Sequence, residues 1–118
     1  MDALTPAQVA EATGFSLDTL RYYEKEGLIR PVERTAGGRR RYRRADVDWL
    51  DLIKCLRDTG MPIADLKRYA RLAQDESTLT ERLELLEAHD RTVQAQIDRL
   101  RRQQEQLHHK MDWYREQL

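Results

Sequence analysis

The sequence of 118 residues has little of what marks several classes of protein. Its single cysteine, Cys55, cannot form a disulfide within the chain, which favours a cytoplasmic protein. No run approaches the roughly 18 apolar residues of a membrane-spanning helix, and the start lacks the basic and apolar regions of a secretory signal. Five glycines and three prolines are too few for a long disordered tract. We therefore expect a small folded protein without a membrane partner.

Groups that would carry catalysis or hold a metal are also missing from the sequence. No nucleophile and base stand in a recognisable motif, and Gly37-Gly38 lacks the strand-to-helix context of a phosphate-binding loop. His108 and His109 are adjacent, and neighbouring helical residues point about 100° apart, so this pair would chelate a metal poorly. The sequence predicts neither an enzyme nor a site for a metal or other cofactor.

Charge is balanced overall but unevenly distributed. The 21 basic and 21 acidic residues cancel. The segment from Leu28 to Arg44 nevertheless sets one acid, Glu33, against seven arginines: Arg30, Arg34, Arg39, Arg40, Arg41, Arg43 and Arg44. A local basic block of this kind can steer a protein to a polyanion such as nucleic acid.

Two short helices are predicted near the start of the chain. Thr5 begins a capping box, TPAQ, with proline at the first helical position, and Gly14 would end this helix in a left-handed conformation. Ser16 would cap a second helix, which Gly27 ends. The expected buried residues are Val9, Ala10 and Thr13 in the first helix and Leu17, Leu20 and Tyr23 or Glu24 in the second. Two helices joined by a turn with a glycine form a candidate helix-turn-helix.

The basic block carries the signals of a β-hairpin. Leu28-Ile29 and residues 41–43 are predicted as its strands, with a tip at residues 36–38. The alternation of side chains along a strand would separate two sets: Arg40 and Tyr42 on one face, Arg39, Arg41 and Arg43 on the other. The hairpin would form a charged wing beside the helix-turn-helix.

Two further helices complete the predicted head. Apolar residues recur at helical spacing between Ala45 and Thr59 and again after Pro62: Trp49, Leu50, Ile53 and Leu56, then Ile63, Leu66, Tyr69 or Ala70, and Leu72. A polar break follows at residues 74–78. We therefore predict a mainly helical protein in which residues 1–74 form a winged helix-turn-helix of four helices and one hairpin.

Residues 75–118 are predicted to form one long helix that dimerises as a coiled coil. From Leu79 to Leu118 the seam advances by alternating steps of four and three, interrupted by polar residues at Asp90 and Gln104. A helix of roughly 60 Å is too long for the head to cover, so a second copy is the simplest cover for its apolar stripe. The alternative is a long surface helix packed on its own domain. The predicted dimer contacts are Leu79, Leu83, Leu86, Val93, Ile97, Leu100, Leu107 and Met111.

Four residues at the start of the second helix are candidates for reading DNA. Ser16 and Asp18 lie in the turn that usually enters the major groove. Arg21 can bond a guanine edge or a phosphate, and Tyr22 can stack on a sugar or donate to a phosphate. Asp18 is discordant, because phosphates repel a carboxylate unless it accepts from cytosine or stabilises the helix start. The alternative is a solvated arginine beside two half-buried tyrosines, but the neighbouring basic wing favours DNA.

The segments LTPAQVAEATGFSLDTLRYYEKEGLIRP and GGRRRYRRADVDWL resemble the DNA-binding head of the mercury-resistance regulator (MerR) family. The resemblance spans residues 4–72, and the heptad helix matches the placement of that family's antiparallel dimerisation helix. The residues it implies as DNA contacts are Ser16, Asp18, Arg21 and Tyr22 in the recognition helix and Arg40 and Tyr42 in the wing. Arg39 stands where the family usually has a tyrosine, which suggests an added phosphate contact.

The resemblance also implies a mechanism. A homodimer would bind a pseudo-palindrome in double-stranded promoter DNA, in the bacterial cytoplasm and at the nucleoid. It would then bend and untwist that DNA to realign the promoter for RNA polymerase.

Cys55 is the candidate sensor. On a helical wheel it lies about 160° from Ile53, away from the apolar stripe, and the stretch IKCLRDTGM resembles the aldehyde- and stress-responsive AdhR and NmlR branch of the family. Sensing of electrophiles or redox stress through Cys55 is one hypothesis. The other is a regulator without an effector, or an architectural DNA-binding protein, with an incidental cysteine. A coiled-coil adaptor is a further class, which salt-dependent binding to a palindrome would distinguish.

Overall fold

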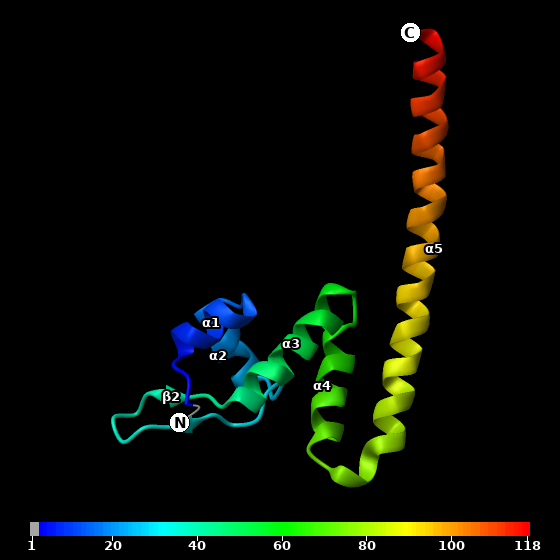
Figure 1. Ribbon diagram of the computed structural model, residues 1–118. Coiled ribbons are helices and arrows are strands. Elements are labelled where there is room, and N and C mark those ends of the chain that lie inside the picture. The colour runs from blue at the N-terminus through cyan, green and yellow to red at the C-terminus, as the bar shows by residue number, and fades with distance from the viewer. Residues whose placement is uncertain (1–2) are drawn as a thin grey trace. The chain divides into compact units, whose positions relative to one another are not determined.

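The computed structural model describes residues 3–118, which form five α-helices, one 3₁₀ turn and a two-stranded hairpin (Figure 1). The described chain divides into two compact units, the first ending at Arg82 and the second comprising Leu83–Leu118. The division expected after residue 74 lies before this boundary, because the 3₁₀ turn and the first residues of the long helix belong to the first unit.

Helices α1 (Pro6–Thr13) and α2 (Leu17–Lys25) form the helix-turn-helix, and their predicted caps are confirmed. The Gln8 amide donates to Thr5 Oγ1 at 3.2 Å, and the Thr5 amide donates to Gln8 Oε1 at 2.9 Å. Gly14 ends α1 with φ +81°, a left-handed conformation that favours glycine. Ser16 caps α2 by accepting from the Thr19 amide at 3.0 Å. These local bonds set where each helix begins and ends.

Strands β1 (Glu33–Arg34) and β2 (Arg40–Arg41) form the antiparallel wing, with Glu33 opposite Arg41. The tip is closed by the Gly38 amide, which donates to Thr35 O at 2.9 Å, close to the predicted turn. The prediction of Leu28-Ile29 as the first strand is wrong. Both residues are buried in the loop after α2, so their apolar character reflects the core rather than strand pairing.

Helices α3 (Arg44–Asp58) and α4 (Ile63–Ala73) supply the other half of the core. The buried apolar side chains of helices α1 to α4 are Val9 from α1, Leu20 and Tyr23 from α2, Val47, Leu50, Ile53 and Leu56 from α3, and Leu66, Tyr69 and Ala70 from α4. Two predicted core residues are wrong, because Leu17 and Ile63 are 44% and 45% exposed. Each is the first residue of its helix, and the turns that pack follow it.

A 3₁₀ turn, η1 (Glu76–Thr78), leads into α5 (Leu79–Gln117), a single unbroken helix. Four leucines of the predicted seam are 57% to 68% exposed in the single chain: Leu79, Leu83, Leu100 and Leu107. Leu86 and Val93 are half-buried. Among residues 3–118, no helix combines the length and apolar character needed to span a membrane.

Candidate nucleic-acid interface

Asp18, Arg21 and Tyr22 share one exposed face of α2, because they lie three and four residues apart. Arg21 Nη2 donates to Asp18 Oδ1 at 2.5 Å, so the carboxylate holds the guanidinium along the helix. This pairing gives the discordant acid a role that needs no contact with a base. The Ser16 hydroxyl is committed to the helix cap, since it also donates to Thr19 Oγ1 at 2.9 Å.

The wing divides its arginine run between two faces, as the alternation predicts. Arg39 and Arg41 are exposed, and within residues 3–118 neither side chain pairs with an acid. Arg40 is 24% exposed, and its Nε donates to Glu24 Oε1 of α2 at 2.7 Å. One face of β2 therefore presents cations to solvent, while the other ties the wing to α2.

Tyr42, which the resemblance implies as a DNA contact, is fully buried, so its side chain is not exposed to a ligand in the described chain. Its backbone pairs with Leu4, whose amide donates to Tyr42 O at 2.8 Å and whose carbonyl accepts from the Tyr42 amide at 2.9 Å. Its hydroxyl has no hydrogen-bond partner in the described chain. Burial raises the pKa of the Tyr42 phenol, and the charge of Glu24 raises it further. Tyr42 is therefore a neutral core residue that anchors the wing.

Three of the seven arginines in the basic block have structural partners. Arg30 bonds both oxygens of the buried Asp46, at 3.0 and 3.2 Å, and Asp46 also accepts from the Arg43 amide at 2.8 Å at the start of α3. Arg34 Nη1 donates to Gly38 O at 3.1 Å within the wing. Arg40 is held by Glu24, as described above. The arginines left exposed without an acidic partner in residues 3–118 are Arg39, Arg41, Arg43 and Arg44.

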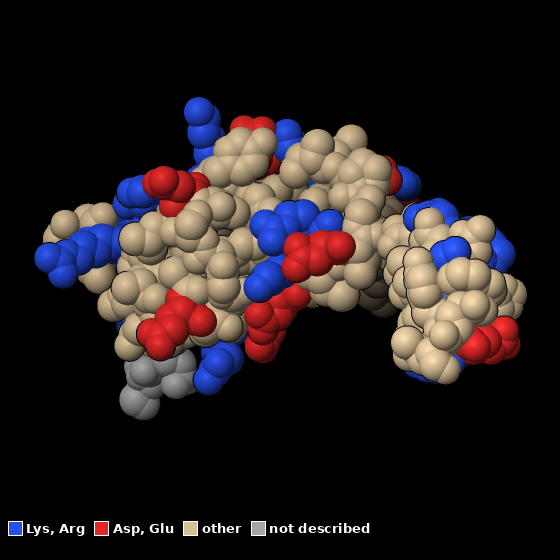
Figure 2. Space-filling view, turned by 90° about the horizontal axis from the view of Figure 1, so that it is seen from above, with Lys and Arg blue, Asp and Glu red and all other residues tan. Residues whose placement is uncertain are grey.

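A groove of about 550 Å³ lies between the start of α1, Leu17 and the wing. Arg39, Arg40 and Arg41 line one side of it, and Thr5 to Ala7 line another. The start of a helix carries a partial positive charge, which adds to that of the arginines. Basic side chains project from the hairpin end of the head in Figure 2. The rest of the lining is mostly apolar (Ala3, Leu4, Pro6, Ala7 and Leu17), so it is the arginine side of the groove that offers donors to an anion such as a backbone phosphate.

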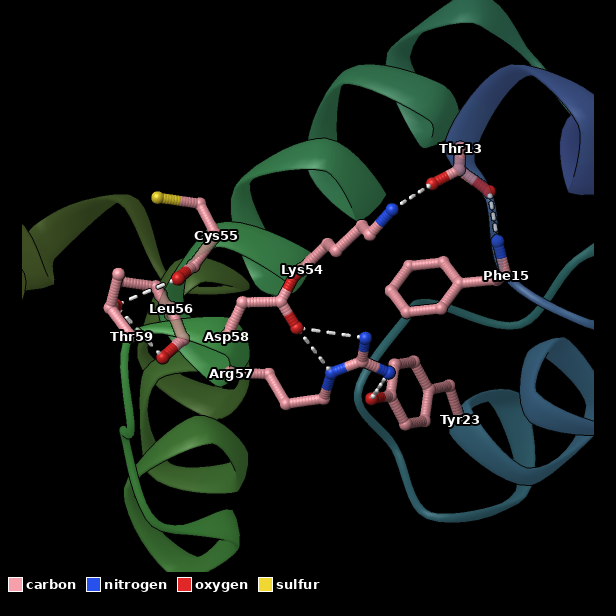
Figure 3. A network of polar contacts seen from close by, with 9 residues as sticks. All are labelled: Thr13, Phe15, Tyr23, Lys54, Cys55, Leu56, Arg57, Asp58 and Thr59. Atoms are coloured by element: carbon pink, nitrogen blue, oxygen red, sulfur yellow. Dashed lines mark hydrogen bonds and ion pairs between the residues drawn. The ribbon is translucent and has the colours of Figure 1, made fainter.

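Cys55 is exposed, and the prediction that it lies off the apolar stripe is confirmed. Figure 3 shows its sulfur pointing away from the helix-turn-helix, while the adjacent Lys54 and the nearby Arg57 point toward it. Lys54 Nζ donates to Thr13 O at 3.0 Å, at the end of α1. Arg57 lies 4.9 Å over the Phe15 ring and donates to the Tyr23 hydroxyl at 3.4 Å. The residues around the thiol thus hold α3 against the helix-turn-helix.

Sequence reasoning missed the contact that Glu24 makes with the wing. The helical pattern offered Glu24 only as an alternative to Tyr23 on the buried side of α2. Its carboxylate meets Arg40 across sixteen residues of sequence. No local sequence pattern predicts a pairing between residues this far apart, because Glu24 and Arg40 come together only when the wing folds.

The helix-turn-helix, the basic wing and the long C-terminal helix define a winged helix-turn-helix DNA-binding protein. Residues 4–73 match the sequence profile of the MerR HTH family regulatory protein, and residues 47–110 match a second profile, MerR, DNA binding. The chain belongs to the MerR family of transcriptional regulators.

Relatives support this assignment. An HTH-type transcriptional regulator of Haemophilus influenzae is 41% identical over 111 residues, covering 93% of this chain and 82% of the relative. HTH-type transcriptional regulator AdhR of Bacillus subtilis is 47% identical over 66 residues, covering 56% of this chain and 47% of AdhR. The crystal structure of HiNmlR, a MerR family regulator lacking the sensor domain, bound to promoter DNA, is similar with a TM-score of 0.86 and 40% identity. That match covers 96% of this chain and 86% of the other.

Proposed function

We propose that this regulator binds double-stranded promoter DNA as a homodimer, with α2 in the major groove and the wing on the adjacent backbone. The observation that carries the proposal is the pair of exposed wing arginines, Arg39 and Arg41, beside a groove suited to phosphate. HiNmlR, which has a similar fold, is itself bound to promoter DNA. Direct contacts are assigned to Arg21, Tyr22 and the wing arginines, while Ser16 and Asp18 act by capping α2 and by holding Arg21.

The proposed partner for α5 is a second copy of the chain. Its seam leucines are largely exposed in one protomer, and a contiguous apolar stripe of this length favours association. A dimer supplies two recognition helices for the two halves of a pseudo-palindrome. Bending and untwisting of the bound promoter would then control its use by RNA polymerase. A regulator acting in this way would work in the bacterial cytoplasm, at the nucleoid.

The test begins with a duplex selected by the purified protein from a random pool. We expect light scattering to report a dimer, and a gel-shift titration to report one dimer per selected duplex. Arg21→Ala should weaken binding to the selected duplex more than to a scrambled one, because a base contact carries sequence preference. A monomeric protein that enriches no duplex at low salt would refute the proposal.

We propose a second role, electrophile or redox sensing, for Cys55. The thiol is exposed, and it lies on α3 beside Lys54 and Arg57, whose side chains contact the helix-turn-helix. Because Cys55 is the only cysteine, thiol reagents report on this site alone. Cys55→Ser should keep DNA binding and lose the transcriptional response to aldehydes or thiol oxidants. An unchanged response in that variant would favour the alternative, a regulator with an incidental cysteine.

A further inference from the structure

We infer that Glu24 is a positioning residue for DNA binding, which fixes the wing against α2 and aims Arg40 at a phosphate. The inference rests on the proposed DNA-binding function. Glu24 lies in the last turn of α2, and its two oxygens have different partners. Oε1 accepts from Arg40 Nε at 2.7 Å, and Oε2 accepts from the Val32 amide at 3.0 Å. Val32 precedes β1 and Arg40 begins β2, so one carboxylate holds both arms of the wing.

The hydrogen bonds of Glu24 to Arg40 and to the Val32 amide, which we call the clasp, are largely shielded from water. The Glu24 and Arg40 side chains are 16% and 24% exposed, so water competes weakly for their bond. Burial opposes ionisation of Glu24, but the hydrogen bonds from Arg40 and the Val32 amide outweigh it and hold the pKa of Glu24 below its ordinary value. Hydrogen bonds to an ionised carboxylate are stronger than neutral ones. The wing is thereby fixed to the recognition helix.

Arg40 retains donors for a second anion. Only its Nε is bonded to Glu24, and within the described chain neither Nη nitrogen has a hydrogen-bond partner. A guanidinium is planar, so fixing one edge sets the direction of the others. Arg40 also lines the groove that it shares with Arg39 and Arg41. A phosphate in that groove would meet a guanidinium already oriented by Glu24.

Whether neutralising Glu24 strengthens or weakens DNA binding distinguishes this role from a purely electrostatic one. A carboxylate near DNA repels phosphates, so neutralising it should strengthen binding if charge were its only effect. If Glu24 positions Arg40 and the wing, the same neutralisation should weaken binding. Glu26 provides a matched control, because it lies two residues away and pairs with Lys67 of α4 at 2.8 Å rather than with the wing.

The experiment measures dissociation constants for the selected duplex with four single variants and one double variant. We expect Glu24→Gln to weaken binding roughly three- to tenfold, and Glu26→Gln to leave it unchanged or slightly tighter. Arg40→Lys keeps the charge but loses the fork of donors, so it should also weaken binding. In an Arg40→Ala background, Glu24→Gln should cause no further loss, because the group that Glu24 positions is gone.

Thermal melting checks that each variant is folded, and hydrogen exchange at the Val32 amide reports whether the clasp has opened. Faster exchange at Val32 in Glu24→Gln, together with weaker binding, supports the inference. If Glu24→Gln fails to fold, Arg40→Lys decides the question, since full affinity there would overturn the inference. Binding by Glu24→Gln that equals or exceeds that of the wild type would also overturn it, as would additive losses in the double variant. A wild-type protein that binds no duplex would instead refute the proposed function.

Discussion

A double variant in which glutamine replaces both Arg39 and Arg41 should bind DNA with an affinity that is much less sensitive to salt. Both side chains are exposed on the wing and have no acidic partner in residues 3–118, so their loss should cost little stability. Their proposed work is to neutralise phosphates at the edge of the groove. Neutralisation releases counterions from DNA, and the number released sets how steeply affinity falls with salt.

The magnitude follows from the number of wings. If each arginine neutralises one phosphate and a dimer has two wings, the double variant loses four contacts. Each contact contributes roughly 0.9 to the slope of log K against log salt, so the slope should fall by about 3.6. Between about 50 and about 200 mM salt, the ratio of wild-type to variant affinity should therefore shrink by roughly a hundredfold.

Fluorescence anisotropy of a labelled selected duplex, titrated at several KCl concentrations, measures this slope. The matched control replaces Arg99 and Arg102, two exposed arginines of α5, with glutamine, so that the change in net charge is the same. The control should keep the wild-type slope to within about one unit. Equal slopes for the wild type, the wing variant and the control would show that Arg39 and Arg41 do not touch phosphates.

Four further predictions follow from the same structure. Gly14→Ala should reduce the free energy of unfolding by about 1–2 kcal/mol and lower the melting temperature by roughly 5–10 °C. The reason is that φ at this position is +81° and that an added Cβ would lie 2.7 Å from Lys54 Nζ. An unchanged melting curve would contradict this. Leu50→Ala should cost about 2–5 kcal/mol in urea unfolding, since Leu50 is fully buried. Folding lowers the pKa of Glu24 below its ordinary value of 4.5. The stability that its contacts with the wing contribute is therefore fully present above pH 4.5 and is lost as the pH falls through the lower pKa of the folded state. In Glu24→Gln, the melting temperature should depend less on pH in this acidic range. If the proposed dimer forms through the seam of α5, Ile97→Asp should make the protein monomeric in light scattering, because it puts a charge in the middle of that apolar seam. A dimer that persists in this variant would count against the seam.

Features set by neighbours in the sequence could be predicted without the fold. The capping box at Thr5, the left-handed Gly14 and the Ser16 cap each depend on a few adjacent residues, and each is confirmed. The single long helix is also confirmed, and the spacing that predicts it repeats along the segment without a glycine or proline. Such signals are reliable because the bonds that create them close within one turn.

Features set by distant neighbours could not be predicted in this way. The apolar pair Leu28-Ile29 fits a strand and a core loop equally well, and only packing against the helices decides between them. Similarly, an arginine run does not reveal which members meet an acid. Within the basic block of residues 28–44, Glu24 pairs with Arg40 and Asp46 pairs with Arg30, each across sixteen residues, once the chain has folded.

The alternation along β2 gives adjacent residues of one basic run different tasks. Arg39 and Arg41 face solvent and carry the free charge, whereas Arg40 and Tyr42 face the head and hold the wing in place. A wing with outward arginines alone would attract DNA without a fixed geometry relative to α2. A wing with inward residues alone would be rigid but nearly neutral. Under the proposed mode of DNA binding, placing both sets in one short strand would couple the electrostatic attraction to the position of α2, so that a backbone contact would influence which bases α2 can reach.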